Sequence, residues 1–421
     1  MEQNNIDHLF RHQFGKMVSI LTRIFGLEHL ETIEDAVQDT FITAIKAWQY
    51  KIPDNPEAWL TAAAKNRVID LFRKIKAEDA RASKLYSGAT TLGISEMFSR
   101  YEIEDSQLRM IFTACHPDLN PKEQIAFALR TISGFSAKEI SSGLLSSEET
   151  IKKRLQRARK TIKQNNIAFE IPTGQQLIIR RDRVLEVLYL IFNEGFHSNL
   201  KDKLVRKELC GEALRLIKLF LKKEPLRDPK SYALFALMCF HSARLESKIN
   251  DKNEIIDIKN QNRKLWYFPL MILGSEAMNK SLENKAVISS YHLEAAIAAE
   301  HLRAPNYKST NWNSILEWYK KLNHLQPSIY TKLNIAIVNI ELNELDAAHE
   351  MLVLLNENDL GKRSYLYFGT LAEYYWKKKD TENALTNINL AIAKVNNTSE
   401  QQYLIKKREI ISSNSNTTYY K

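Results

Sequence analysis

Glycine and proline are scarce in this sequence, whose 421 residues include only 12 Gly and 10 Pro. These residue types interrupt helices and strands, so their scarcity favours long, continuous elements. Strands would alternate polar and apolar residues, and no region of the sequence sustains that alternation. Helical spacing of apolar residues dominates instead, and a chain of this length holds about two to four domains. The sequence therefore predicts an all-α, multidomain protein.

Cysteine is also rare, and long apolar runs are missing. Cys115, Cys210 and Cys239 lie far apart, without the close Cys or His spacing of zinc sites or disulfide frameworks, so we expect no metal and no cofactor. Cys115 is followed by His116 and Pro117, which is typical of a helix end rather than of a catalytic pair. No apolar run reaches the ~18 residues of a membrane span, and the N-terminus lacks a signal-peptide pattern. These absences favour a cytoplasmic protein without membrane contact.

The chain carries a net charge of +10, but this excess is spread unevenly. Residues 1–170 hold 24 basic and 22 acidic residues, whereas the remainder holds 36 and 28. Net charge alone is therefore weak support for nucleic-acid binding, and local clustering of basic side chains on one helix face is the stronger signal.

The segment from Phe135 to Lys163 shows such clustering and has the pattern of a helix-turn-helix. A short helix over 136–141 leads through Ser142-Gly143 into a longer helix, which Ser146 or Ser147 is placed to cap. The longer helix has an apolar face, formed by Ile151, Leu155, Ala158 and Ile162. Residues 147–163 include seven basic and two acidic residues. A capped helix with a basic outer face fits the major groove of DNA, and a solvated helix on a bundle is the alternative.

The same segment resembles the promoter-reading helix-turn-helix of the sigma-70 family. Glu139-Ile140 and Leu144 precede TIKKRLQRAR, the run from Thr150 to Arg159, and Glu149 stands where that family commonly has Gly. The resemblance implies that the outer face of the second helix contacts the −35 promoter element. The side chains of that face are Thr150, Lys152, Lys153, Arg154, Gln156, Arg157, Arg159 and Lys160.

An acidic cluster marks the N-terminal part of the chain, where no basic residue occurs between Arg23 and Lys46. The cluster leads into apolar residues at helical spacing, so it predicts a helix with an acidic end and a buried face. Such a helix suits docking on a basic protein partner, and a solvated surface helix is the alternative. The acidic residues are Glu28, Glu31, Glu34, Asp35 and Asp39.

Residues 57–76 predict a further helix, with five basic residues and one acidic residue between Lys65 and Lys76. Trp59 lies on this helix with Asn66 and several cations, a combination that suits stacking and phosphate contacts with single-stranded DNA. Taken alone, Trp59 is better explained as an anchor of the hydrophobic core.

Both N-terminal helices resemble sigma region 2, as found in the extracytoplasmic-function (ECF) group. EDAVQDTFITAIKAW is similar to the helix that binds core RNA polymerase, and NPEAWLTAAAKNRVIDLFRK is similar to the promoter-melting helix. The resemblance implies contacts of Asp35, Gln38 and Asp39 with the β′ clamp helices, and a second polymerase contact at the β flap. No segment corresponds to sigma region 3 or to an N-terminal inhibitory region, which is the ECF plan. The side chains implied at the −10 element are Trp59, Asn66, Arg67, Asp70, Arg73 and Lys74.

The resemblance divides the first part of the chain into a region 2 domain at 1–80, a flexible linker at 81–105 and a region 4 domain at 106–168. The linker is rich in Ser, Thr, Ala and Gly and ends in an acidic patch, Glu102, Glu104 and Asp105. Segments 105–117, 187–196 and 261–266 further resemble an ECF subgroup that carries a C-terminal domain.

Residues 175–421 predict stacked helix pairs. Segments 328–355 and 364–391 align at a period of 36, which pairs Ala336 with Ala372 and Ala348 with Ala384. Small residues at such positions let helices cross closely, as in tetratricopeptide (TPR) arrays. We therefore expect a TPR-like α-solenoid with a concave surface for an unknown protein partner. Charged and aromatic residues of this part line a groove or, more simply, pack between helices: Arg244, Arg263, Trp266 and Trp312.

The sequence thus predicts an ECF-type sigma factor that is not an enzyme, with promoter DNA and core RNA polymerase as partners and a C-terminal TPR-like domain. One alternative is a helix-turn-helix regulator with a TPR-like sensor, which is not a polymerase subunit and does not need the acidic helix. A second is an enzyme built on the helical half, but no paired carboxylates, metal ligands or nucleophile motif occur there at a useful spacing.

Overall fold

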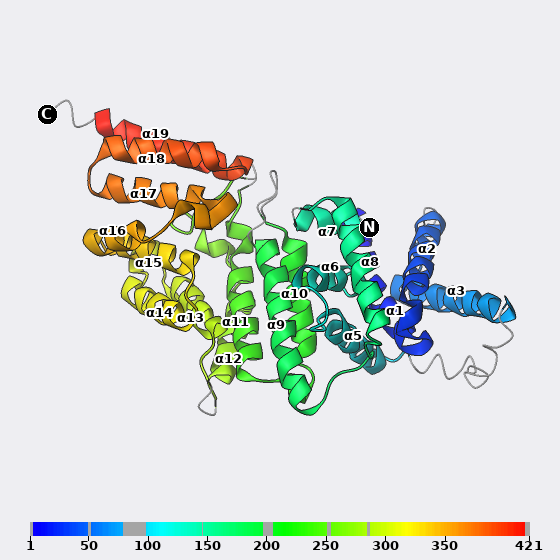
Figure 1. The fold of residues 1–421 in the computed structure, drawn as a ribbon. Helices are drawn as coiled ribbons and strands as arrows, with labels where there is room; N and C mark the ends of the chain where they lie inside the picture. The colour runs from blue at the N-terminus through cyan, green and yellow to red at the C-terminus, as the bar shows by residue number, and fades with distance from the viewer. Residues whose placement is uncertain are drawn as a thin grey trace. The chain divides into compact units, whose positions relative to one another are not determined.

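The computed structural model describes residues 3–48, 52–78, 98–144, 146–196, 205–250, 254–283 and 287–416. Helices, turns and an isolated bridge between Ile249 and Ile255 make up these ranges, and no strand occurs within them. The predicted all-α fold is confirmed. The chain divides into two compact units, Met1–Ile191 and Phe192–Lys421 (Figure 1). None of the helices in the described ranges is long and apolar enough to cross a membrane.

The first unit begins with three helices that pack on one another: α1 (Gln3–Phe25), α2 (Leu30–Trp48) and α3 (Pro56–Glu78). Apolar side chains at helical spacing, such as Val18, Ile33 and Val37, are fully buried between them. Gly26 ends α1 with a φ of 100°, a conformation that glycine adopts at little cost. Pro56 opens α3, where its missing N–H is no loss.

Four further helices follow in the first unit, and each begins after a residue whose side chain caps it. Ser99 precedes α5 (Arg100–Ala114), and Asn120 precedes α6 (Pro121–Thr131). Ser136 forms a capping box with Glu139 at the start of α7 (Ala137–Gly143). Ser147 accepts a hydrogen bond from the Thr150 N–H at 3.1 Å and starts α8 (Glu148–Gln164). The predicted helix-turn-helix is α7 and α8, with Ser147 rather than Ser146 as the cap.

The buried face of α8 is the predicted one. Ile151 and Ala158 are fully buried, and Leu155 and Ile162 are each 5% exposed. The predicted helix end at Cys115 is also present, since this buried residue is the C-cap of α5. Local sequence signals therefore located these helices and their inward faces.

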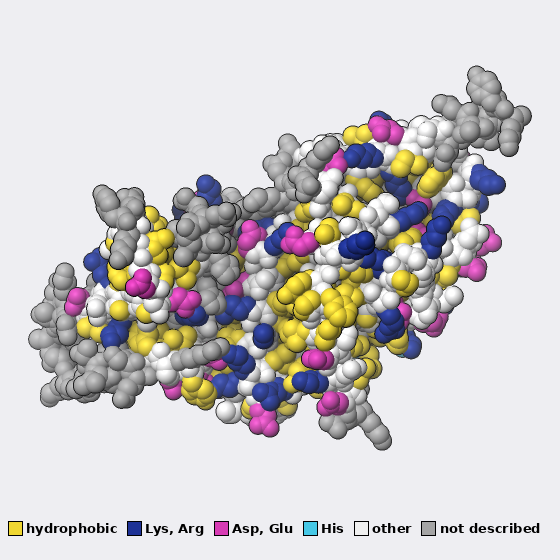
Figure 2. All heavy atoms as spheres, turned by 180° about the vertical axis from the view of Figure 1, so that it is seen from behind, with side chains coloured by type: hydrophobic (Ala, Val, Ile, Leu, Met, Phe, Trp, Pro, Cys, Tyr) yellow, Lys and Arg dark blue, Asp and Glu magenta, His cyan; other side chains and the backbone are white. Residues whose placement is uncertain are grey.

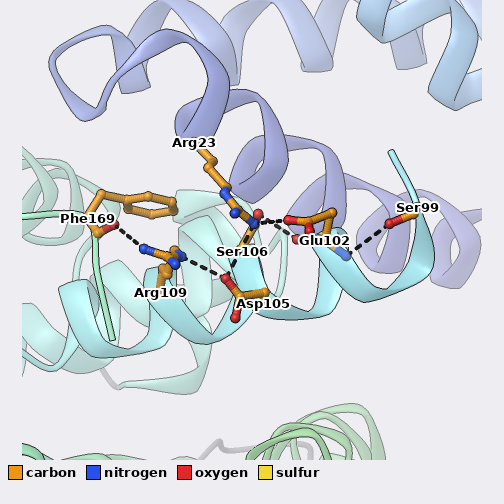
Figure 3. A network of polar contacts seen from close by, with 7 residues as sticks. All are labelled: Arg23, Ser99, Glu102, Asp105, Ser106, Arg109 and Phe169. Atoms are coloured by element: carbon orange, nitrogen blue, oxygen red, sulfur yellow. Dashed lines mark hydrogen bonds and ion pairs between the residues drawn. The ribbon is translucent and has the colours of Figure 1, made fainter. Parts of the chain in front are cut away.

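The start of α5 differs from the predicted linker, because residues 100–105 are helical. Arg23 of α1 forms ion pairs with Glu102 and Asp105, and Arg109 Nε donates to Asp105 at 2.8 Å (Figure 3). Ser99 caps the helix at the same end. The acidic patch expected at the end of the linker is thus a helical surface that binds α1. Residues 81–97 of the predicted linker lie outside the described residues.

Helix α9 (Gly174–Phe196) begins where the sequence indicated a boundary, with Gly174 at a φ of 57°. Its first part belongs to the first unit, because Arg180 donates to the Phe112 carbonyl at 2.7 Å and lies 5.7 Å from that ring's centroid. The division between the units therefore falls inside α9 rather than before it.

The second unit is a succession of helices in which neighbours along the chain pack together (Figure 1). Short 3-10 turns connect them: η3 (Glu224–Leu226), η4 (Leu245–Ser247), η5 (Arg263–Leu265), η7 (Tyr307–Ser309) and η8 (Glu357–Arg363). The α-helices are α10 (Lys207–Phe220), α11 (Pro229–Ala243), α12 (Phe268–Ser281), α13 (Ser290–Arg303), α14 (Trp312–Leu325), α15 (Ile329–Glu341), α16 (Leu345–Val353), α17 (Tyr365–Lys377), α18 (Thr381–Lys394) and α19 (Thr398–Asn416).

The 36-residue period appears in side chains and in backbone. The predicted pair Ala336 of α15 and Ala372 of α17 is fully buried, as is the second pair, Ala348 of α16 and Ala384 of α18. Asn343 and Lys379, 36 positions apart, both adopt left-handed backbone with φ of 63° and 62° after α15 and α17. A TPR-like arrangement of α15 to α18 is compatible with these repeated features.

Large hydrophobic side chains are exposed on η5 and α12. Leu265, Tyr267 and Phe268 are 51, 58 and 64% exposed. Figure 2 shows one face of the molecule, where hydrophobic side chains gather between Lys and Arg side chains. Exposed apolar groups of this kind are typical of contact surfaces.

Candidate nucleic-acid and protein interfaces

The residues implied in polymerase binding lie on the exposed side of α2. Asp35, Gln38 and Asp39 are exposed and share one helix face, while Ile33 and Val37 on the other side are fully buried. Two of the three already have partners in the first unit. The other, Asp35, makes no ion pair with any residue that the structure describes.

The partners of Gln38 and Asp39 are arginines. Gln38 Oε1 accepts from Arg130 of α6 at 3.4 Å, and Asp39 Oδ2 lies 2.9 Å from Arg67 of α3. Arg67 is one of the residues implied at the −10 element, and its side chain is 60% exposed. The structure thus joins a residue implied in polymerase binding to one implied in DNA binding.

Glu34 of α2 belongs to the acidic cluster that the sequence assigned to a docking or solvated surface, but the structure buries it within the first unit. It is 1% exposed, pairs with Arg159 of α8, and lies 3.8 Å from Arg130 Nε. Burial raises the pKa of the Glu34 carboxyl, while the charges of Arg159 and Arg130 act in the opposite direction. Because the burial cost offsets the attraction, this contact specifies how α2 meets α8 more than it stabilises the unit.

Helix α8 therefore uses part of its implied DNA face for a contact with α2. A groove lined by Glu31, Leu155, Gln156 and Arg159 lies along this contact. Glu31 and Glu34 of α2 lie next to the Arg159 guanidinium group. In this structure Arg159 is therefore engaged within the first unit.

The remaining basic residues of α8 fall into two groups. Lys152 Nζ lies 2.8 Å from Glu148 and Lys153 Nζ 2.7 Å from Glu149, one turn earlier on the same helix. Arg154, Arg157 and Lys160 form no ion pair with the described residues. Of these, Arg157 and Lys160 are exposed. These unpaired cations, with the exposed Gln156, are the part of α8 that is free to meet DNA.

The implied −10 residues lie along α3. Trp59 is partly buried and packs edge-on against Trp48 with ring centroids 5.6 Å apart, so the core-anchor explanation holds for one side of its ring. Asn66 and Asp70 are exposed, as is Arg67. The side chains of Arg73 and Lys74 lie outside the described part of the structure.

The comparisons with protein families match three parts of the chain. Residues 9–78 match Sigma-70 region 2, and residues 109–162 match Sigma-70, region 4. These ranges contain the contacts of α2, α3 and α8 described above. Residues 180–282 match a family of unknown function, DUF6596. The chain therefore carries the two sigma-70 regions in the predicted order.

A relative covers most of the chain. The uncharacterized protein R00370 of Rhizobium meliloti is 31% identical over 381 residues, which span 89% of each chain. This chain belongs to the same family as that protein. No solved structure matches the chain.

Two more distant relatives are described as sigma factors. A probable ECF RNA polymerase sigma factor, SigI of Mycobacterium tuberculosis, is 23% identical over 201 residues, 44% of this chain and 68% of its own length. The ECF RNA polymerase sigma factor SigE of Mycolicibacterium smegmatis is 24% identical over 172 residues, 37% of this chain and 60% of its own. The two sigma-70 regions and these relatives support a sigma factor for transcription initiation.

The burial of Glu34 follows from its position in the sequence. Helical spacing aligns it with Leu30, Val37 and Phe41, which are all buried. A carboxylate on a buried stripe needs a cationic partner, but the 125 positions between Glu34 and Arg159 hide which one.

Proposed function

We propose that this protein is an ECF-type sigma factor that directs core RNA polymerase to a set of promoters and helps to open them. The observation that carries the proposal is the pair of sigma-70 regions in order, with a capped α8 whose outer face retains unpaired cations. The protein is not an enzyme in this proposal, because the polymerase supplies the catalysis of RNA synthesis.

Each surface takes one role in the proposed complex. The exposed face of α2 with Asp35 meets the β′ clamp helices, and region 4 meets the β flap. The outer face of α8 contacts the −35 element, where Arg154 and Arg157 supply unpaired guanidinium groups. The exposed face of α3, with Asn66 and Arg67, lies along the −10 element.

We also propose that region 4 separates from region 2 when the complex forms. Arg130 and Arg159 of region 4 hold Gln38 and Glu34 of α2, so both interfaces are engaged internally. Clamp helices that take up α2 would compete with these contacts and free Arg159 for DNA. The free-energy cost of this exchange is small, because the desolvation of Glu34 offsets its attraction to Arg159.

The second unit fits the proposed TPR-like regulatory domain of an ECF subgroup. The buried alanines at a period of 36 and the repeated left-handed turns support this assignment. A protein partner on the solenoid would then modulate the sigma regions.

The test is transcription by purified core polymerase with and without the full chain, on genomic DNA, followed by sequencing of the RNA 5′ ends. New, discrete start sites that share upstream elements support the sigma assignment. If the chain instead binds DNA alone and never co-purifies with core polymerase, it is a stand-alone helix-turn-helix regulator.

A further inference from the structure

Two cations of the second unit share one aromatic ring. The Arg244 guanidinium carbon lies 5.3 Å from the Phe196 ring centroid, and Lys248 Nζ lies 3.6 Å from it. Lys248 Nζ also donates a hydrogen bond to the Phe196 carbonyl at 2.7 Å. The His241 ring lies 4.6 Å from the same ring, centroid to centroid. The ends of α9 and α11 and the residue after η4 thus bring two full charges and an imidazole together.

A third cation extends this group toward α13. Arg263 donates to the carbonyls of His301 and Ala304, both at 2.7 Å, and lies 4.3 Å above the Trp266 ring. These contacts fix the guanidinium group but leave its charge uncompensated. We call Arg244, Lys248, Arg263, His241 and His301 the basic cluster.

The basic cluster carries more positive than negative charge within the part of the chain that the structure describes, where Glu400, a carboxyl whose pKa burial raises, acts on Lys248 from a distance. Arg244, Lys248 and Arg263 form no ion pair with any described carboxylate. Buried atoms of the cluster also lack hydrogen-bond partners there, namely Arg263 Nη2, His241 Nδ1 and His301 Nδ1. Cations gathered without counter-ions repel one another and lose hydration, so this arrangement is costly unless an anion joins it.

The protonation equilibria of the cluster reflect the same surplus of positive charge. Burial, with the charge of Arg244, lowers the pKa of Lys248 to about 7. Burial lowers the pKa of Arg244 to about 10, and burial with two arginine charges lowers the pKa of His301 to about 4. As whole residues, Arg244, Lys248 and His301 are nevertheless only partly buried, so the cluster is not enclosed on every side.

We propose that the basic cluster binds the phosphate group of a small molecule. A phosphate dianion pairs with more than one cation at once, and guanidinium groups match its oxygens in a bidentate fork. It would supply the missing negative charge and accept hydrogen bonds from the orphaned donors. The cluster lies wholly within the second unit, and all of its members except His301 lie inside the DUF6596 match, so the proposal is independent of the sigma function.

Thermal unfolding of the full chain in increasing sulfate or inorganic phosphate tests the site, with chloride at equal ionic strength as the reference. An anion that binds only the folded state raises Tm with its concentration. We expect this rise for the wild type and for Arg303→Gln, a control in which a 74% exposed arginine of the same unit is replaced. Sulfate and phosphate also stabilise folded proteins without binding to a site, so Arg244→Gln should show only this general effect and a clearly smaller rise in Tm than the wild type. A rise of equal size in Arg244→Gln, or none in the wild type, would overturn the proposal.

The Tm of Arg244→Gln in the absence of sulfate and phosphate distinguishes an anion-binding role of Arg244 from a role in packing. If the guanidinium group waits for an anion, Arg244→Gln in chloride buffer should unfold at the wild-type temperature or above it, because an uncompensated charge is removed. A lower Tm, together with an unaltered wild type in sulfate, means that Arg244 serves packing, and the binding site is rejected.

The pH dependence of sulfate binding tests Lys248, because sulfate itself does not titrate near neutral pH. Sulfate binding requires protonated Lys248, whose pKa is about 7 without ligand, so affinity should fall roughly tenfold between pH 6 and pH 8. The groups facing Lys248 are Arg244, His241 with a lowered pKa, Cys210 with a pKa of about 12, and Glu400 with a raised pKa. Lys248→Met should remove the pH dependence that belongs to the lysine. Equal pH dependence in both proteins would refute the role of Lys248.

Discussion

The contact between α1 and α6 gives a sharp prediction, because Gly15 lies against the end of α6 with no space for a side chain. A Cβ on Gly15 would lie 1.7 Å from the carbonyl oxygen of Ile132 and 2.6 Å from its carbonyl carbon. A carbon and an oxygen in ordinary contact are about 3.3 Å apart, so Gly15→Ala must push the helices apart by roughly 1.5 Å. The obstacle is backbone and cannot rotate away.

The magnitude follows from two opposing effects. Overpacking a well-filled contact costs about 1–3 kcal/mol, while alanine in a helix interior gains about 1 kcal/mol over glycine. We therefore expect Gly15→Ala to lower the unfolding free energy of the first unit by up to about 2 kcal/mol. Gly211→Ala is the matched control, since Gly211 lies inside α10 with nothing within 4 Å of its Cβ position. That variant should be stabilised.

The assay is denaturant unfolding followed by circular dichroism, together with binding of a −35 DNA fragment. Separation of α6 from α1 should also loosen the pair of Glu34 and Arg159, so Gly15→Ala should bind the fragment more tightly than Gly211→Ala does. If Gly15→Ala is stabilised as much as Gly211→Ala, regions 2 and 4 do not pack as closely as the structure has them, and the reasoning fails.

Three further predictions concern the sigma regions. Asp35→Arg should weaken binding to core polymerase by about 1 kcal/mol, roughly fivefold, in a pull-down titration without loss of stability; unaltered binding would remove α2 from the interface. Arg157→Ala should cost about 1–3 kcal/mol in promoter binding if it reads a base edge. Lys152→Ala should cost less, because Lys152 is paired within its own helix, and the reverse order would refute the assignment. Removing α9 and all that follows should destabilise the first unit by about 1–3 kcal/mol, because Arg180 no longer donates to the Phe112 carbonyl. The control is a chain that keeps the α9 residues of this unit. Equal melting temperatures of the two truncated chains would contradict the contact.

Local features of the fold were predictable from the sequence. Ser136 and Ser147 cap helices because their side chains bond N–H groups three residues ahead, and the apolar face of α8 follows from spacing alone. The long-range contacts were not predictable. Arg23 binds Glu102 across 79 positions, which turned an expected linker end into a helix fixed on α1.

The candidate sites show the same division. Residues of α2, α3 and α8 were placed on exposed faces by helical periodicity, whereas their mutual pairing depends on tertiary structure. The sequence indicated Arg244 and Arg263 as residues that line a groove or pack between helices. The sequence did not predict that these arginines lie over the Phe196 and Trp266 rings, because the loops between helices determine which residues meet there. The uncompensated charge is a property of that arrangement and not of any motif.

The ion pair of Asp39 with Arg67 has a consequence for the order of events at a promoter. Under the proposed function, polymerase contacts Asp39 and DNA contacts Arg67. Binding of either partner therefore breaks the ion pair and frees the residue that the other partner contacts. Such linkage is reciprocal, and an exposed pair of this kind is worth at most about 1 kcal/mol, or roughly fivefold in affinity. The affinity of the free protein for chromosomal DNA would thus be slightly lower than that of the polymerase-bound protein. Molecules already bound to polymerase would present an unpaired Arg67 to the DNA strands as they separate.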